Sequence, residues 1–167
     1  IGDDRTYQYL ESFPLGAIRL ANLCLPREQR SAISTDQYNS LRNHVRDTVR
    51  QSIRKIRDLK PEMAIGSSGT IMNLAEITQK VIHQNGGGSD TILSLKDLRT
   101  VISLLCSRTL DQRRKVPGIN PDRADIIIPG AAILEIFMKE AGLDTLQVTG
   151  RGLQVTFGKS TNSPWNS

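Results

Sequence analysis

A strand-like segment that runs through a glycine-serine turn into a helical pattern places the strongest constraint on the fold of this chain. The segment reads Ala64-Ile65-Gly66-Ser67-Ser68-Gly69-Thr70, and the apolar residues after it recur at helical spacing. Gly66 and Gly69 can take positive φ angles and let a ligand approach the main chain, while the amides that follow lie at a helix N-terminus. The turn therefore predicts a phosphate cradle, although a plain connection between a strand and a helix has the same composition.

Composition narrows the class of protein. The 167 residues, 38% apolar and 23% charged, fit one globular domain. The longest apolar stretch, 126–138, is too short to span a bilayer, and no basic-then-apolar leader precedes it. Cys24 and Cys106 lack the spacing of a metal site and are expected to be reduced. We expect a cytoplasmic protein with no membrane attachment.

One expected helix, Asp36 to Lys60, holds most of the excess positive charge of a chain whose formal net charge is +5. Ser34 or Thr35 can cap its start, and its apolar residues fall on one face. A stripe of arginines lies beside that face, at Arg42, Arg46, Arg50, Arg54 and Arg57. Planar guanidinium groups in a row suit a bound polyanion, but a solvated helix surface has the same pattern.

The other expected elements alternate between strands and helices, which favours an α/β layer architecture. Few strands are visible for a complete sheet. We expect strands at Tyr7–Phe13, Met63–Ile65 and Leu146–Val148, helices at Leu15–Leu25, after Gly69 and at Leu95–Leu110, and a surface loop at Asn85–Asp90. A last helix should begin at Pro121 with Asn120 as its cap, kink at Pro129, continue to Met138 and stop at Gly142.

Three motifs occur in a consistent order along the chain. They are Ser12–Leu20 (SFPLGAIRL), Ala64–Ile77 (AIGSSGTIMNLAEI) and Val116–Leu134 (VPGINPDRADIIIPGAAIL). With these motifs the chain resembles the exopolyphosphatase and guanosine pentaphosphate phosphohydrolase family from about Tyr7 to Leu153.

The resemblance implies a ribonuclease-H-like lobe of the actin-like superfamily. Its mixed sheet would be flanked by helices and would lack its first strand. Residues 1–159 would form the second lobe of a two-lobe phosphatase, followed by a polar tail at 160–167. Such enzymes hydrolyse the terminal phosphoanhydride of polyphosphate or guanosine pentaphosphate, with a glutamate that activates water and with Mg²⁺. That glutamate and the metal loop precede the Ser12 motif in the family, so we expect no catalytic residue and no metal ligand here, and an inactive fragment.

The resemblance also assigns roles to individual residues. Gly66, Ser67, Ser68, Gly69 and Thr70 match a phosphate loop whose amides and hydroxyls hold phosphate oxygens, and Arg123 is a candidate phosphate contact. Asp125 is expected to orient a backbone or basic group, and Arg19 could reach the cleft or form a structural ion pair. Arg46 and Arg50 are secondary candidates on the basic helix. The expected partners are polyphosphate or guanosine pentaphosphate and the first lobe of the same protein, and a homodimer stays open.

Two other functions remain as alternatives. One is a lobe of another actin-like phosphotransferase, of the acetate or sugar kinase type, which shares the second phosphate loop. The other is a non-catalytic module that binds a polyanion through the Arg42–Arg57 stripe. Transfer of phosphate from ATP to an acceptor would favour the first, and binding that depends on the stripe would favour the second.

Overall fold

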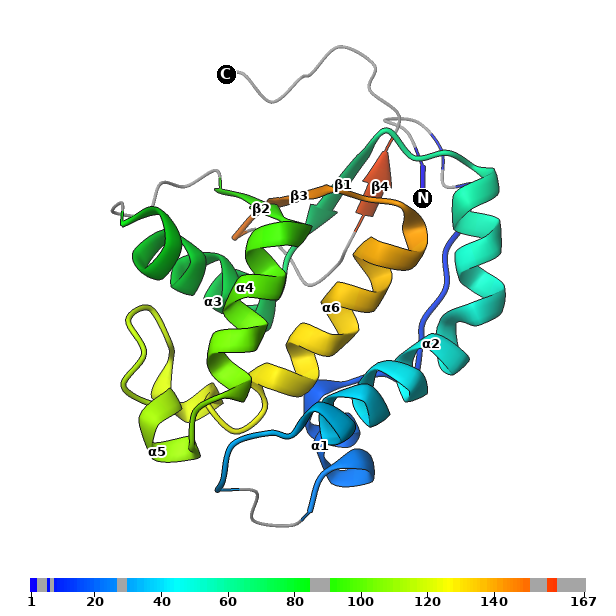
Figure 1. Cartoon of the computed structure of the whole chain (residues 1–167). Coiled ribbons are helices and arrows are strands. Elements are labelled where there is room, and N and C mark those ends of the chain that lie inside the picture. The colour runs from blue at the N-terminus through cyan, green and yellow to red at the C-terminus, as the bar shows by residue number, and fades with distance from the viewer. Residues whose placement is uncertain (3–5, 7, 27–29, 85–90, 151–155, 159–167) are drawn as a thin grey trace.

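A computed structural model of the chain describes residues 1–2, 6, 8–26, 30–84, 91–150 and 156–158 (Figure 1). Its sheet has four strands in the order β2-β3-β1-β4. Strand β1 is parallel to β3 and antiparallel to β4, and β2 is antiparallel to β3, so the sheet is mixed. The strands are β1 (Met63–Gly66), β2 (Thr91–Ser94), β3 (Thr145–Val148) and β4 (Thr156–Gly158).

Helices cover the sheet and form most of the molecule. They are α1 (Ala17–Cys24), α2 (Thr35–Asp58), α3 (Gly69–Thr78), α4 (Leu95–Cys106), α5 (Leu110–Arg113) and α6 (Ile127–Ala141). A π-helical turn at Gln79–His83 extends α3, and a short 3-10 helix covers Pro121–Arg123. The expected α/β architecture, a mixed sheet flanked by helices, is confirmed.

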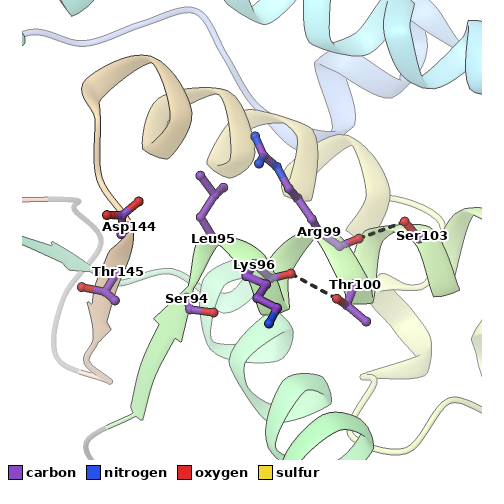
Figure 2. A pocket seen from close by; sticks show the side chains of 8 residues that line it. All are labelled: Ser94, Leu95, Lys96, Arg99, Thr100, Ser103, Asp144 and Thr145. Carbon is purple, nitrogen blue, oxygen red and sulfur yellow. Dashed lines mark hydrogen bonds between the residues drawn. The ribbon is translucent and has the colours of Figure 1, made fainter.

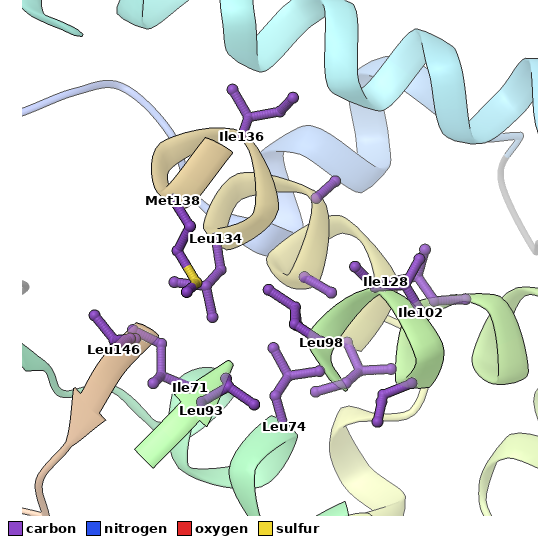
Figure 3. Close-up of a cluster of buried hydrophobic side chains, with 14 of the residues drawn as sticks. Ile71, Leu74, Leu93, Leu98, Ile102, Ile128, Leu134, Ile136, Met138 and Leu146 are labelled. Carbon is purple, nitrogen blue, oxygen red and sulfur yellow. The ribbon is translucent and has the colours of Figure 1, made fainter. Parts of the chain in front are cut away.

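Helix α6 lies at the centre of this arrangement and packs against α1, α2, α3 and α4. Figure 3 shows Leu134 and Met138 of α6 pointing toward the strands and α3, whereas Ile136 points toward α2. All three are buried. Because both sides of α6 are covered, its sequence is apolar nearly all round, as expected for a helix in a core.

The long basic helix α2 forms as the sequence predicts. Ser34 accepts a hydrogen bond from the backbone N–H of Gln37, and the Gln37 side chain binds the backbone N–H of Ser34, which makes a capping box. The apolar stripe of α2 faces the core, with Leu41, Val45 and Val49 fully buried. Its arginines therefore lie toward the surface.

The prediction of a strand at Tyr7–Phe13 is wrong. The structure describes residues 8–13 of this segment, and they form no strand. The backbone N–H groups of Gln8 and Tyr9 bind the carbonyl of Ile1 instead of a neighbouring strand. The aromatic side chains pack on helices, with the rings of Phe13 and Phe137 edge to face at 5.6 Å. The apolar alternation reflects contacts with α2 and α6, not a place in the sheet.

The last helix also differs from its expected form. Asn120 caps the 3-10 helix Pro121–Arg123, accepting a hydrogen bond from Asp122 N at 3.0 Å, and α6 begins separately at Ile127. Pro129 thus lies in the first turn of α6, where a backbone N–H has no carbonyl partner to lose, so it causes no kink. Gly142 ends the helix with φ +73°, as expected.

Three further elements depart from expectation. Strands β2 and β4 were not expected, and the helix predicted at Leu95–Leu110 ends at Cys106, with a new capping box at Thr109 that starts α5. The loop at 85–90 and the tail at 160–167 lie outside the described residues. No described helix is long and apolar enough to cross a membrane.

Candidate functional site

The loop between β1 and α3 presents free backbone amides at a helix N-terminus. The Ser68 side chain caps α3 and accepts a hydrogen bond from Ile71 N at 3.1 Å, while the Ser68 carbonyl accepts one from Met72 N at 2.9 Å. Within the described residues the N–H groups of Gly69 and Thr70 are left for a ligand. These two donors point along the positive end of the helix dipole, which is the usual arrangement for binding an anion.

The glycines of this loop provide space rather than unusual backbone angles. Among the described glycines only Gly118 and Gly142 have positive φ, so the sequence-based account of Gly66 and Gly69 is wrong on this point. A Cβ on Gly66 would lie 2.6 Å from Cδ2 of Leu146, and one on Gly69 would lie 2.5 Å from Nη2 of Arg123. Position 69 is therefore a glycine because the Arg123 guanidinium occupies the space that a side chain at position 69 would fill.

Arg123 comes from the 3-10 helix, far from the loop in sequence, and its guanidinium lies directly against Gly69. The side chain is half-buried, and within the described residues it forms no ion pair. A guanidinium beside two free amides at a helix N-terminus forms a compact set of donors for phosphate oxygens. The structure thus brings together the two segments on which the predicted site depends.

A buried asparagine connects these two segments. Asn73 of α3 donates from Nδ2 to the Gly118 carbonyl at 2.5 Å and accepts a hydrogen bond from Asn120 N at 3.1 Å. Gly118 lies so close to α3 that a Cβ there would be 2.9 Å from the Glu76 backbone. Sequence reasoning missed Asn73, although a polar residue among the apolar positions of α3 was a usable signal.

The hydroxyl groups of the loop are less available than expected. The Ser68 hydroxyl caps α3, and Ser67 is 3% exposed. The methyl group of Thr70 packs against Gly130 of α6, where any Cβ would collide with it. The two amides, the Thr70 hydroxyl and Arg123 are accordingly the donors left without a hydrogen-bond partner among the described residues.

Within the described residues, neither Asp125 nor Arg19 forms an ion pair or a hydrogen bond with these donors. Asp125 is exposed, and its charge raises the pKa of the neighbouring Arg113, although burial has the larger effect and the pKa of Arg113 is lowered overall. Arg113 is 1% exposed and donates to the carbonyls of Ala124 and Ser31 at 3.0 and 3.3 Å. Arg19 is exposed on α1 and makes no ion pair within the described chain.

The two secondary candidates on α2 belong to a separate groove of about 230 Å³. It is lined by Arg46, Val49, Arg50, Ile53, Arg54, Arg57 and Glu140. Arg46 forms an ion pair with Glu140 at 3.1 Å, and Arg50 is exposed. No residue of the β1–α3 loop lines this groove.

A larger, open groove of about 690 Å³ lies along α4 and the start of β3 (Figure 2). Three of its hydroxyl groups already bind the helix backbone: Ser94 accepts a hydrogen bond from Asp97 N, Thr100 donates to the Lys96 carbonyl, and Ser103 donates to the Arg99 carbonyl. Arg99 forms an ion pair with Glu135 at 3.1 Å. This groove too contains no residue of the phosphate loop.

Glu135 is a buried carboxylate that sequence reasoning did not single out. It accepts a hydrogen bond from the Tyr38 hydroxyl at 2.9 Å and lies 3.3 Å from Nε of Arg42 and 3.1 Å from Nε of Arg99. Burial, together with the nearby Glu135 charge, raises the pKa of Tyr38. The cluster joins α2, α4 and α6, so its evident role is structural.

Side chains that commonly bind metal ions are not clustered in the part of the chain that the structure describes. No group of three or more His, Cys, Asp or Glu side chains that could hold a metal ion occurs among the described residues. Cys24 and Cys106 are free thiols.

All three sequence motifs lie within the region that a known protein family matches. The model of the Ppx/GppA phosphatase family matches residues 1–155. The chain belongs to this family. Exopolyphosphatase 1 of Mycobacterium leprae is 28% identical over 151 residues, and exopolyphosphatase 2 of Mycobacterium tuberculosis is 25% identical over 143 residues. The matched regions cover 88% and 83% of this chain but only 43% and 44% of those proteins, so the chain spans less than half of their length.

Solved structures of the Ppx/GppA family have the same fold. An exopolyphosphatase from Cytophaga hutchinsonii superposes with a TM-score of 0.74 at 21% identity, over 87% of this chain and 47% of that one. The Aquifex aeolicus family member gives a TM-score of 0.68 at 16% identity, over 87% and 45%. These neighbours show that the chain has the fold of Ppx/GppA family proteins, as the resemblance implied.

Proposed function

We propose that this chain is the phosphate-binding lobe of a phosphatase that hydrolyses the terminal phosphoanhydride of polyphosphate or guanosine pentaphosphate. One observation carries the proposal: the Arg123 guanidinium lies against Gly69, beside the free N–H groups of Gly69 and Thr70. The related mycobacterial proteins are named exopolyphosphatases 1 and 2, which supports the same substrate class.

In this proposal the donors stabilise negative charge on the phosphoryl group. Hydrolysis of a phosphoanhydride spreads charge over the phosphoryl oxygens, and fixed amides and a guanidinium lower the barrier by binding that charge. A carboxylate must also position the attacking water. We assign that carboxylate and the ligands of Mg²⁺, which neutralises phosphate charge in such enzymes, to a preceding lobe, with the substrate between the two lobes.

The donor set alone should bind anions weakly and release no phosphate. Two or three charge-assisted hydrogen bonds of about 1.5 to 3 kcal/mol each, less the cost of association, leave about millimolar affinity. We therefore expect calorimetric titration with tripolyphosphate to give a dissociation constant in this range, and an assay with polyphosphate and Mg²⁺ to detect no turnover. Rapid phosphate release by the chain would contradict the assignment of the catalytic carboxylate to another lobe.

The Arg123→Gln variant tests the site itself. It removes the guanidinium but keeps the Cβ–Cγ–Cδ stem and a polar end, and should weaken tripolyphosphate binding about tenfold, which corresponds to about 1.4 kcal/mol. Arg19→Gln is the matched control, because Arg19 is exposed and distant from the donor set in the sequence. Equal loss in both variants would mean that the chain attracts anions only through its net charge.

Polyphosphate and guanosine pentaphosphate present the same terminal anhydride to the loop. Competition separates them, because a lobe that holds only phosphates should bind tripolyphosphate and the guanosine nucleotide with similar affinity. Much tighter binding of the nucleotide would indicate a guanosine pocket. Membership of a phosphatase family argues against the acetate or sugar kinase alternative.

A further inference from the structure

We propose that the arginine groove on α2 is a second anion-binding surface, which holds an extended stretch of inorganic polyphosphate away from the reacting end. The inference rests on the proposed function, since it concerns the same substrate. The arginine groove is defined by Arg46, Val49, Arg50, Ile53, Arg54, Arg57 and Glu140.

The spacing of the arginines suits a linear polyanion. Arg46, Arg50, Arg54 and Arg57 are separated by four, four and three positions, so they fall on one face of α2. With a rise of about 1.5 Å per residue, the row is about 16 Å long. A row of this length can contact several consecutive phosphate groups, whereas a single phosphate can meet only one or two arginines.

Most of the positive charge in the arginine groove is not neutralised. Arg46 forms an ion pair with Glu140, but Arg50, Arg54 and Arg57 are exposed and have no ion pair with any described residue. The neighbouring basic side chain Lys55 instead lies over the Tyr9 ring, 5.4 Å from its centroid. Three like charges so close together repel one another, and a bound polyanion relieves this repulsion.

The remaining lining of the arginine groove favours polyphosphate over nucleic acid. Between the arginines lie the aliphatic residues Val49 and Ile53, and no aromatic side chain of the described residues lines the groove. Proteins that hold single-stranded nucleic acid usually stack its bases on aromatic rings. The arginine groove therefore offers contacts to a phosphate chain without a platform for bases.

The distance between the two anion sites predicts a dependence on chain length. Gly130 lies near one end of α6 and contacts Thr70 of the phosphate loop. Glu140 lies near the other end and belongs to the arginine groove. Along α6 these two residues are about 15 Å apart. Tripolyphosphate is too short to reach both sites, so only a longer chain can gain affinity from the arginine groove.

The test compares ligands of different length on two kinds of variant. In the double variant Arg50→Gln and Arg54→Gln, long-chain polyphosphate should bind about tenfold more weakly, while tripolyphosphate affinity stays unchanged. The control double variant, Arg19→Gln and Arg114→Gln, removes the same charge from other exposed positions and should leave both affinities close to wild type. A single-stranded DNA oligonucleotide of similar charge should bind the wild-type chain more weakly than polyphosphate does.

Each other outcome has a distinct meaning. If the groove variant keeps wild-type affinity for long polyphosphate while Arg123→Gln loses it, the arginine groove is only a solvated surface and the proposed function stands. If wild type binds neither polyphosphate nor tripolyphosphate, both proposals fail. If the DNA oligonucleotide binds most tightly and its affinity falls in the groove variant, the groove binds nucleic acid and the assignment to polyphosphate is overturned.

Discussion

The close approach of Arg123 to Gly69 makes a single hydrogen atom at position 69 decisive for the donor set. A methyl group there would meet the guanidinium, which is the flexible end of a long side chain and can move aside. We therefore expect Gly69→Ala to displace Arg123 and weaken tripolyphosphate binding several-fold, with less than about 1 kcal/mol of change in stability, because alanine also favours the helix. Calorimetric titration and thermal unfolding measure the two effects.

Gly16→Ala is the matched control for this substitution. Gly16 precedes α1, and a Cβ there would meet nothing within 4 Å. It should leave tripolyphosphate affinity unchanged. Unaltered binding in Gly69→Ala as well would mean that Arg123 takes no part in holding the anion.

Cys106 gives a pH-dependent prediction. Burial raises the pKa of its thiol from 9.0 to about 11, with the Arg113 charge opposing this and Glu135 adding to it. The folded state favours the neutral Cys106 thiol. The stability that the neutral thiol contributes is therefore complete below pH 9 and is lost as the pH rises to about 11. We expect the alkylation rate of Cys106, followed by mass spectrometry, to keep increasing up to about pH 11. A plateau near pH 9 would contradict the raised pKa.

At the scale of elements, the Asn73 side chain fastens α3 to the segment that carries Arg123. The Asn73→Ala variant leaves the Gly118 carbonyl and the Asn120 N–H without their partner, at a cost of about 1 to 3 kcal/mol. Urea unfolding should show this loss, and tripolyphosphate binding should weaken as well. Asn43→Ala, on the exposed face of α2, should do neither. Lower stability of Asn73→Ala with unchanged tripolyphosphate affinity would show that Arg123 holds its position without the Asn73 hydrogen bonds.

The Glu135 cluster links three helices and predicts a purely structural effect. Glu135→Ala removes the common partner of Tyr38, Arg42 and Arg99. Because both arginines are partly exposed to solvent, we expect a loss of about 2 kcal/mol, below the 3 to 5 kcal/mol typical of a fully buried pair. Chemical denaturation measures it, with Glu140→Ala as a smaller surface comparison. A stability change no larger than that of the control would contradict the role assigned to Glu135.

The elements that local sequence signals specify were predictable. The Ser34 cap, the apolar stripe of α2 and the glycine-serine turn are encoded by residues close together in the sequence. The family resemblance pointed to Arg123, which the structure places against Gly69. Strand β2 leads directly into α4 at Leu95, so no turn residue separates its short apolar pair from the helical pattern that follows. The aromatic residues near the N-terminus pack on helices rather than on a strand. Asn73, Arg113 and Glu135 were missed because their partners are remote in sequence and become visible only in the fold.

At the scale of the whole molecule, the helix packing places the phosphate loop and the arginine groove on one cooperative unit. Both rest on α6, which contacts four other helices and is buried along most of its length. Small domains of this kind usually unfold in one step. We expect a single thermal transition, and a midpoint that rises when long polyphosphate is added. Two separate transitions would show that the regions are independent.

The central position of α6 has an energetic consequence for these two surfaces. A ligand held at either end stabilises the same helix against opening, so its backbone amides should exchange more slowly with deuterated solvent whichever end is occupied. Occupation of one end would thereby lower the entropic cost of ordering at the other. Binding at one surface can then strengthen binding at the other because both ligands suppress local unfolding of α6, without any change in the folded structure.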